Sequence, residues 1–243
     1  MFLSYQNRQI ASIPIKDCRH FRGYRYGLFS NHIYEDYIYG LSRNVPVESL
    51  RLQFIKRLLG TRTNDFGETL GISLSKHYDN WDYPWNISAL KCEYTPLNNP
   101  DIVCHTSLSK KILMSHINRE FLWLESAYNS IIRQGYLPEK YGYITVLRLV
   151  SHQKNSFIVL DGNHRLSALS VLGETHVKMK VVNNIILRDS LCYLWFGFLV
   201  RNYTLSDMKA VFVRYFADAN PVINEMEDFS LILLDENSLV RFP

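Results

Sequence analysis

The residues with the clearest chemical potential form one short run between a predicted strand and a predicted helix. They are Asp161, Gly162, Asn163, His164 and Arg165. The apolar run 157–160 predicts a buried strand, and leucines at 166, 169 and 172 predict an amphipathic helix directly after it. The first turn of a helix carries unpaired N–H groups and the positive end of the helix dipole, so these side chains predict an anion site. The structural alternative is that Asp161 or Asn163 only caps the helix and that Arg165 is solvated.

The same run resembles the signature of the ParB/sulfiredoxin superfamily. The matching residues are Asp161-Gly162-Asn163-His164-Arg165, Leu166-Ser167-Ala168-Leu169 and Leu172-Gly173. Upstream, residues 125–131 with Gly135 resemble the helix that ends Ser-Ile-x-x-x-Gly in ParB proteins, and residues 177–182 are similar to the closing strand. The resemblance covers residues 101–185 and implies an α+β fold, a ParB/sulfiredoxin-like core in which helices pack on a small mixed sheet.

Departures from the family patterns indicate which branch is closest. Sulfiredoxins carry Gly-Gly-Cys-His-Arg at this place, ParB domains carry Gly-Glu-Arg-Arg, and the free-serine kinases carry Asp-Gly-His-His-Arg. Asn163 stands where sulfiredoxins have the catalytic Cys, and an amide cannot attack phosphate or sulfur. Asp161 matches only the kinase branch. The resemblance therefore implies a kinase that transfers phosphate from a nucleotide, with ATP as the expected donor and Mg²⁺ as the metal.

Phosphoryl transfer needs a cradle for the phosphates, neutralising cations and a base near the acceptor hydroxyl. The N–H groups of Gly162, Asn163 and His164 would form the cradle, with Arg165 as the cation. Asp161 is the candidate metal ligand or base, and His164 is a further catalytic candidate. In the serine kinases a Glu before the long helix is the base, and the resemblance places Glu120 there. The alternative for Glu120 is a partner of the helix dipole.

Aromatic, His and Asp residues gather in a loop-like segment between residues 60 and 100. The candidates are His77, Asp79, Trp81, Asp82 and Trp85. Carbohydrate sites use flat ring faces and carboxylates, so this mixture predicts binding of a hydroxylated acceptor such as a sugar or the end of a surface glycan. The function expected on this basis lies in surface polysaccharide biosynthesis. The alternative is a long loop whose tryptophans pack onto the core.

Composition narrows the class of protein and its location. The chain has 243 residues, of which 47% are hydrophobic and 21% charged, as in a folded globular protein. A formal charge of +4 suits phosphorylated ligands, and the chain lacks the clustered basic residues of a dedicated nucleic-acid binder. Four scattered cysteines without C-x-x-C favour a reducing compartment. The N-terminus lacks an apolar leader, and the apolar run 191–200 is about half a bilayer long, so we expect a cytoplasmic protein without a membrane span.

The chain order predicts three parts. An aromatic-rich region (1–100) precedes the superfamily-like core (101–185), and a helical region (186–243) follows it. Periodicity and capping predict helices over 47–59, 115–134, 189–200 and 205–216, and a hairpin of strands 143–150 and 157–160. Two other functions stay open at this point. One is a ParB-like CTP- or ATP-binding switch, and the other is a nucleic-acid-associated protein or nuclease.

Overall fold

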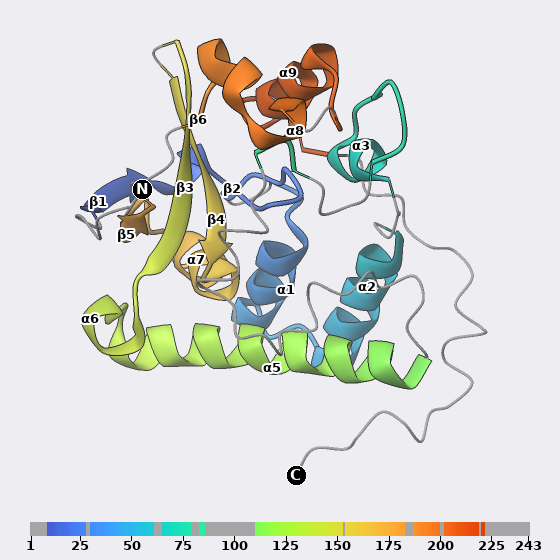
Figure 1. The fold of residues 1–243 in the computed structure, drawn as a ribbon. Coiled ribbons are helices and arrows are strands. Elements are labelled where there is room, and N and C mark those ends of the chain that lie inside the picture. The colour runs from blue at the N-terminus through green and yellow to red at the C-terminus, as the bar shows by residue number, and fades with distance from the viewer. Residues whose placement is uncertain are drawn as a thin grey trace.

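The computed structural model describes residues 9–27, 30–60, 65–78, 83–85, 110–152, 154–182, 187–199, 202–218 and 220–221. Within these residues a six-strand mixed sheet has the order β1-β5-β3-β4-β2, and β6 pairs with β3 (Figure 1). The strands are β1 (Gln9–Pro14), β2 (Cys18–Arg19), β3 (Ile144–Ser151), β4 (Lys154–Asp161), β5 (His176–Val181) and β6 (Leu187–Arg188). The α+β class expected from the sequence is confirmed.

The centre of the sheet is the predicted hairpin. β3 and β4 are antiparallel from Ser151 opposite Lys154 to Thr145 opposite Asp161, with one register shift between Thr145 and Val146. β5 lies on the other side of β3 and runs parallel to it. Successive side chains of β4 point to opposite faces, so Val159 enters one core and Ile158 enters another. The sheet therefore separates two layers of packed helices.

Four helices cover the first face of the sheet (Figure 1). They are α1 (Ile33–Ser42), α2 (Val47–Gly60), α5 (Lys110–Gln134) and α7 (Asn163–Val171), and the short α6 (Pro138–Tyr141) connects α5 to β3. Ile38, Phe54 and Phe121 are almost fully buried between these helices. The helices predicted over 47–59 and 115–134 are confirmed, and α5 begins five residues earlier than its predicted start.

The second face carries α3 (Phe66–Leu70), η4 (Asp189–Leu194), α8 (Phe196–Leu199) and α9 (Leu205–Arg214). The single helix predicted over 189–200 is wrong, because η4 is a 3-10 helix and Trp195 has extended backbone before α8 begins. Tertiary packing explains the break. Trp195 is buried against Phe212, and the Gly197 N–H donates to the Pro84 carbonyl at 2.7 Å. No helix in the described part of the chain is long and apolar enough to cross a membrane.

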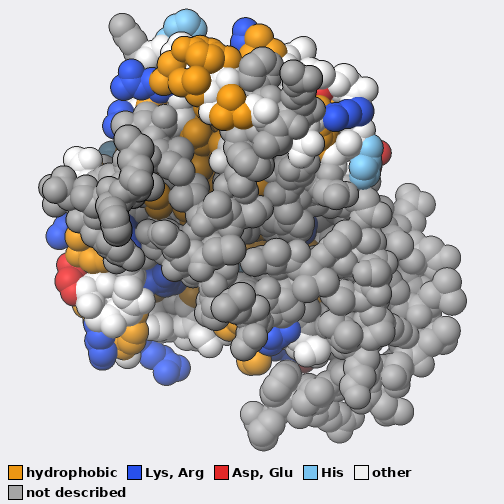
Figure 2. Space-filling view, viewed as in Figure 1, with side chains coloured by type: hydrophobic (Ala, Val, Ile, Leu, Met, Phe, Trp, Pro, Cys, Tyr) orange, Lys and Arg blue, Asp and Glu red, His pale blue; other side chains and the backbone are white. Residues whose placement is uncertain are grey.

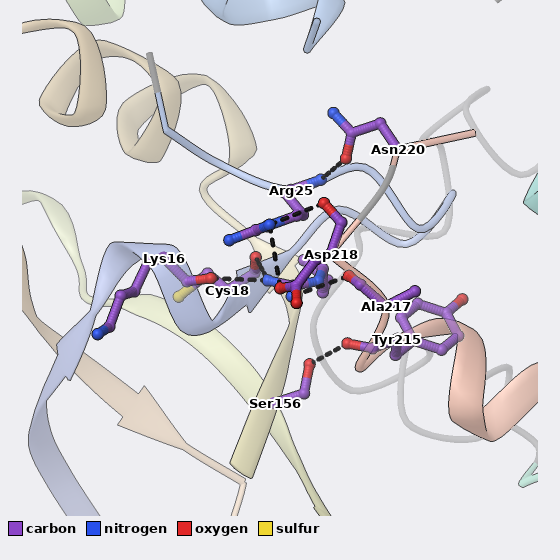
Figure 3. Close-up of polar contacts among 9 residues, drawn as sticks. Lys16, Cys18, Arg25, Ser156, Tyr215, Ala217, Asp218 and Asn220 are labelled. Atoms are coloured by element: carbon purple, nitrogen blue, oxygen red, sulfur yellow. Dashed lines mark hydrogen bonds and ion pairs between the residues drawn. The ribbon is translucent and has the colours of Figure 1, made fainter. Parts of the chain in front are cut away.

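The first 30 residues, for which the sequence predicted no element, supply both ends of the strand path. β1 pairs antiparallel with β5, and β2 pairs parallel with β4, with a 3-10 helix η1 (Ile15–Asp17) between them. The segment after α9 is tied to this region (Figure 3): Arg25 donates to the Asp218 carbonyl at 2.7 Å, and Ser156 Oγ donates to the Tyr215 carbonyl at 2.7 Å. Segments from both ends of the described chain thus meet at β4.

Candidate functional site

The turn between β4 and α7 is built on Gly162. This residue is the N-cap of α7 and has a left-handed backbone with φ of +90°. A Cβ at this position would lie 2.8 Å from Ile144 Cγ1 and 3.1 Å from Arg165 Nη2, so no larger residue fits without movement. No side chain caps the helix, so the structural alternative in which Asp161 or Asn163 is the cap is wrong. The N–H groups at the first turn, from Asn163 to Arg165, have no intrahelical acceptor.

The first turn of α7 meets α5 through a pair of ionisable side chains. His164 Nε2 lies 2.8 Å from Glu120 Oε2, and Glu120 is only 4% exposed. The His164 ring stacks on Tyr34 with ring centroids 5.1 Å apart and lies 5.6 Å from Trp123. Glu120 lies inside α5, not in a segment before it, so both its family-based placement and the helix-dipole alternative at a helix start are wrong. The packing of α5 on α7 nevertheless brings Glu120 and His164, which the sequence nominated separately, into hydrogen-bonding contact.

A second contact fixes the neighbouring residue, Asn163. The Tyr26 hydroxyl donates to Asn163 Oδ1 at 2.6 Å, and the Tyr26 side chain is buried. Because the amide oxygen faces Tyr26, the amide nitrogen is turned the other way. Burial raises the pKa of Tyr26 well above its ordinary value, and nearby Cys18 and Glu35 add to the rise. Tyr26 therefore remains a proton donor. The only sequence signal for it was the density of tyrosines in residues 24–39.

A buried histidine, His32, packs against Tyr26 and Tyr34, the two tyrosines that contact the start of α7. His32 is the N-cap of α1, where its Nδ1 accepts a hydrogen bond from the Tyr34 backbone N–H at 3.3 Å. Its ring lies 4.6 Å from Tyr26 and 5.5 Å from Tyr34, centroid to centroid. Burial, with smaller contributions from Arg57 and His164, lowers the pKa of His32 to about 3. His32 is therefore neutral, and its role is to position the two tyrosines.

Asp161 and Arg165 form an i,i+4 pair beside the same turn. Arg165 Nη2 lies 3.2 Å from Asp161 Oδ2, and Arg165 Nη1 donates to the carbonyl oxygens of Tyr141 and Gly142. Both terminal nitrogens of Arg165 thus bind other parts of the fold, and its role as a phosphate cation stays a prediction. The Asp161 side chain is 55% exposed, which leaves its carboxylate accessible at the end of β4.

The predicted metal ligand, Asp161, fits one mode of Mg²⁺ binding. In the described part of the chain no group of three or more His, Cys, Asp or Glu side chains could hold a metal ion. Mg²⁺ commonly takes one or two carboxylates from the protein and its other ligands from substrate phosphates and water. An exposed carboxylate next to an open helix N-terminus is suited to that mode.

The predicted acceptor residues lie elsewhere. His77 Nδ1 is 3.0 Å from Asp65 Oδ2, and Asp65 is the N-cap of α3. Trp85 is 5% exposed and packs 5.4 Å from Trp195, so it belongs to the core on the second face and its ring offers no surface for stacking. Asp79, Trp81 and Asp82 lie outside the described residues.

Comparisons of the chain with protein-family models, with curated proteins and with solved structures found no match. The resemblance to the ParB/sulfiredoxin superfamily thus rests on the motif alone.

Proposed function

We propose that this protein is a kinase that transfers the terminal phosphate of a nucleotide, with ATP as the expected donor, to a hydroxyl group of a small molecule or glycan. The observation that carries the proposal is the 2.8 Å contact between Glu120 Oε2 and His164 Nε2 at the uncapped start of α7. An imidazole held by a buried carboxylate is suited to general base catalysis. An open helix N-terminus is suited to phosphate binding.

The roles follow from the hydrogen bonds. When Glu120 accepts the Nε2–H of His164, the remaining lone pair of the imidazole is on Nδ1. His164 then takes the acceptor's hydroxyl proton at Nδ1 as the acceptor oxygen bonds to the terminal phosphorus. The bond to the bridging oxygen breaks, and its electrons leave on the nucleoside diphosphate. The N–H groups of the first turn and the Asn163 amide hold the phosphates during this exchange.

Asp161 would hold Mg²⁺ together with the phosphates, and when bound the ion neutralises charge that develops on them. Trp123 offers a flat face for a ligand next to the base, because its side chain is 39% exposed and lies beside His164. A sugar or glycan acceptor is consistent with that face. The strand–turn–helix from β4 to α7, followed by β5 parallel to β3, supports the assignment to a ParB/sulfiredoxin-like fold. An ATP donor also implies a cytoplasmic location.

A transfer assay on the full chain tests the proposal. A thermal-shift screen with ATP, ADP, CTP and GTP, each with and without Mg²⁺, first identifies the donor by stabilisation of the folded protein. Radiolabelled phosphate transfer is then measured to a panel of sugars, serine and glycan fragments. We expect Glu120→Gln and His164→Asn to lower turnover by about 10²-fold or more while nucleotide affinity changes little.

Glu125→Gln is the matched control. Glu125 lies on the same helix and is hydrogen-bonded to Tyr37 and Arg51 rather than to His164, so its variant should keep turnover. Full activity in both Glu120→Gln and His164→Asn would remove the proposed base. Tight nucleotide binding without transfer to any acceptor would indicate a nucleotide-binding switch instead.

A further inference from the structure

A cavity of about 360 Å³ lies on the second face of the sheet, away from α5 and α7. It is lined by His152, Asp189, Ser190, Cys192, Trp195, Lys209, Phe212 and Val213. These residues come from the tip of the β3–β4 hairpin, from η4 and the residue after it, and from α9. The volume is within the range of small-molecule pockets, roughly 300–1,000 Å³.

The inner part of the cavity is apolar and aromatic. Cys192, Trp195 and Phe212 are all buried, and the rings of Trp195 and Phe212 have centroids 5.2 Å apart. Phe212 and Trp195 also belong to the second core, which fixes their positions. The buried rings thus form a rigid floor, and Val213, which is 60% exposed, offers the accessible apolar surface at the mouth of the cavity.

The charged groups at the rim are not equivalent. Asp189 is already engaged, because Ser151 Oγ donates to its Oδ2 at 2.7 Å and the Ser190 N–H donates to its Oδ1 at 2.7 Å. His152 has a 93% exposed side chain and lies 4.0 Å from Asp189. Lys209 is exposed and makes no hydrogen bond or ion pair with any described residue. Asp189 is thus held by two neutral donors, whereas Lys209 is a rim cation without a partner among the described residues.

Exposed apolar side chains lie on the same two helices that line the cavity. Leu191, Tyr193 and Leu194 of η4 are 38%, 50% and 56% exposed, and Val213 of α9 is 60% exposed. Figure 2 shows hydrophobic side chains gathered at the top of the molecule, over the region where Figure 1 places α8 and α9, with Lys and Arg side chains to either side. Contiguous exposed apolar surface of this kind marks binding sites more often than plain surface.

We propose that this cavity binds an amphipathic anion, a molecule with an aromatic or aliphatic body and one carboxylate, phosphate or sulfonate group. The body would lie against Val213 at the mouth of the cavity, over the buried rings of Trp195 and Phe212, and the anionic group would pair with Lys209. The site is independent of the kinase proposal, because it lies on the other face of the sheet and shares no residue with the Glu120–His164 pair.

Binding of 8-anilinonaphthalene-1-sulfonate to the full chain tests the proposal, because this probe combines an aromatic body with one sulfonate. We expect a saturable fluorescence increase that 10-carbon decanoate displaces at about tenfold lower concentration than 1-decanol, which has the same chain without the charge. Lys209→Met should abolish that difference and weaken probe binding about tenfold. Val213→Glu should have the same effect on the probe, since residues 209 and 213 are i,i+4 neighbours and a carboxylate there pairs with Lys209.

Two exposed sites supply controls of the same chemistry, Lys178→Met on β5 and Ile132→Glu on α5, and both should bind the probe like the wild type. Circular dichroism and thermal melting of each variant establish that it is folded. Probe binding that does not saturate, or that is equal in Lys209→Met, Val213→Glu and the wild type, would overturn the proposal. Lys209-dependent sedimentation with anionic phospholipid vesicles would identify the source of the amphiphile as a membrane lipid. Displacement of the probe by decanoate without such sedimentation would identify a free amphiphile.

Discussion

The hydrogen bond from Tyr26 to Asn163 provides a sharp test of how the start of α7 is organised. Tyr26→Phe removes only the hydroxyl and keeps the buried ring that packs on His32. Asn163 Oδ1 then loses a donor at 2.6 Å, and its amide is free to rotate or flip. If the proposed phosphate site is correct, this amide donates to the phosphates only while Tyr26 holds its oxygen. Stability and nucleotide affinity should therefore fall together.

The structure sets the size of both effects. A hydrogen bond of this kind contributes about 0.5–1.5 kcal/mol, and more when the remaining partner stays buried and unpaired. Asn163 is only partly buried, so water can replace the lost donor and we expect a loss of about 1 kcal/mol of unfolding free energy. Ordering one released side chain again on binding costs about 0.5–1.5 kcal/mol, which weakens nucleotide binding roughly fivefold.

Chemical unfolding and calorimetric titration of nucleotide measure these two quantities. Tyr24→Phe is the control, since Tyr24 is equally buried but its hydroxyl is not hydrogen-bonded to α7. Combining Tyr26→Phe with Asn163→Ala should give a coupling energy of about 0.5 kcal/mol or more. Because the Tyr26 pKa is raised, the effects should be the same at pH 6 and pH 9. Tyr26→Phe indistinguishable from Tyr24→Phe, or strictly additive with Asn163→Ala, would refute the reasoning.

Three further changes probe neighbouring groups. Asp161→Asn should leave the fold intact, because Asp161 is not a cap and its pair with Arg165 is exposed. In calorimetry it should abolish the gain in nucleotide affinity on adding Mg²⁺, and in transfer assays it should lower turnover about 10²-fold. Arg165→Lys keeps the positive charge but loses the guanidinium that binds the Tyr141 and Gly142 carbonyls and Asp161. If these contacts are the main role of Arg165, the unfolding free energy falls by about 2 kcal/mol, whereas a role of its charge alone predicts little change. Burial raises the pKa of Glu35 to about 7. The folded state therefore favours the protonated carboxyl, and up to about 3 kcal/mol of unfolding free energy present at low pH should be lost as the pH rises from about 4.5 through 7. Glu35→Gln should flatten this part of the plot of unfolding free energy, measured with urea, against pH.

Local signals in the sequence were sufficient for the strand, turn and helix of the candidate site. The apolar run 157–160 and the leucine spacing after it predicted β4 and α7, because both depend on residues close together in the chain. Gly162 marked the turn, although its left-handed N-cap geometry became clear only from the backbone. The contact between Glu120 and His164 depends on how α5 packs against α7, which no local pattern encodes.

The N-terminal contributions were missed for a related reason. Tyr26 contacts Asn163 and Tyr34 contacts His164, each from more than 100 residues away in the chain. Residues 1–40 also show no clear periodicity of apolar residues. Helix α3 was missed within a segment expected to be loop-like, yet its signal was present. Asp65 precedes Glu68 by three residues and caps its N–H at 2.9 Å, which is a recognisable start of a helix. For Trp85 composition left two alternatives open, and tertiary packing decides for the one in which the ring packs onto the core.

The placement of the N-terminal strands has a consequence for how acceptor and nucleotide binding can be separated. Removing residues 1–100 would strip β1 from β5 and β2 from β4, which exposes two strand edges, and would uncover the first core by deleting α1 and α2. We therefore expect residues 101–243 alone to aggregate or to lack a cooperative thermal transition, rather than to form a nucleotide-binding core. A point variant separates the roles without this loss. Trp123→Ala changes a side chain that is 39% exposed beside His164, so it should raise the acceptor KM at unchanged stability if that ring binds the acceptor. A soluble truncated protein with a cooperative transition and full nucleotide affinity would show that the first 100 residues are dispensable for the core.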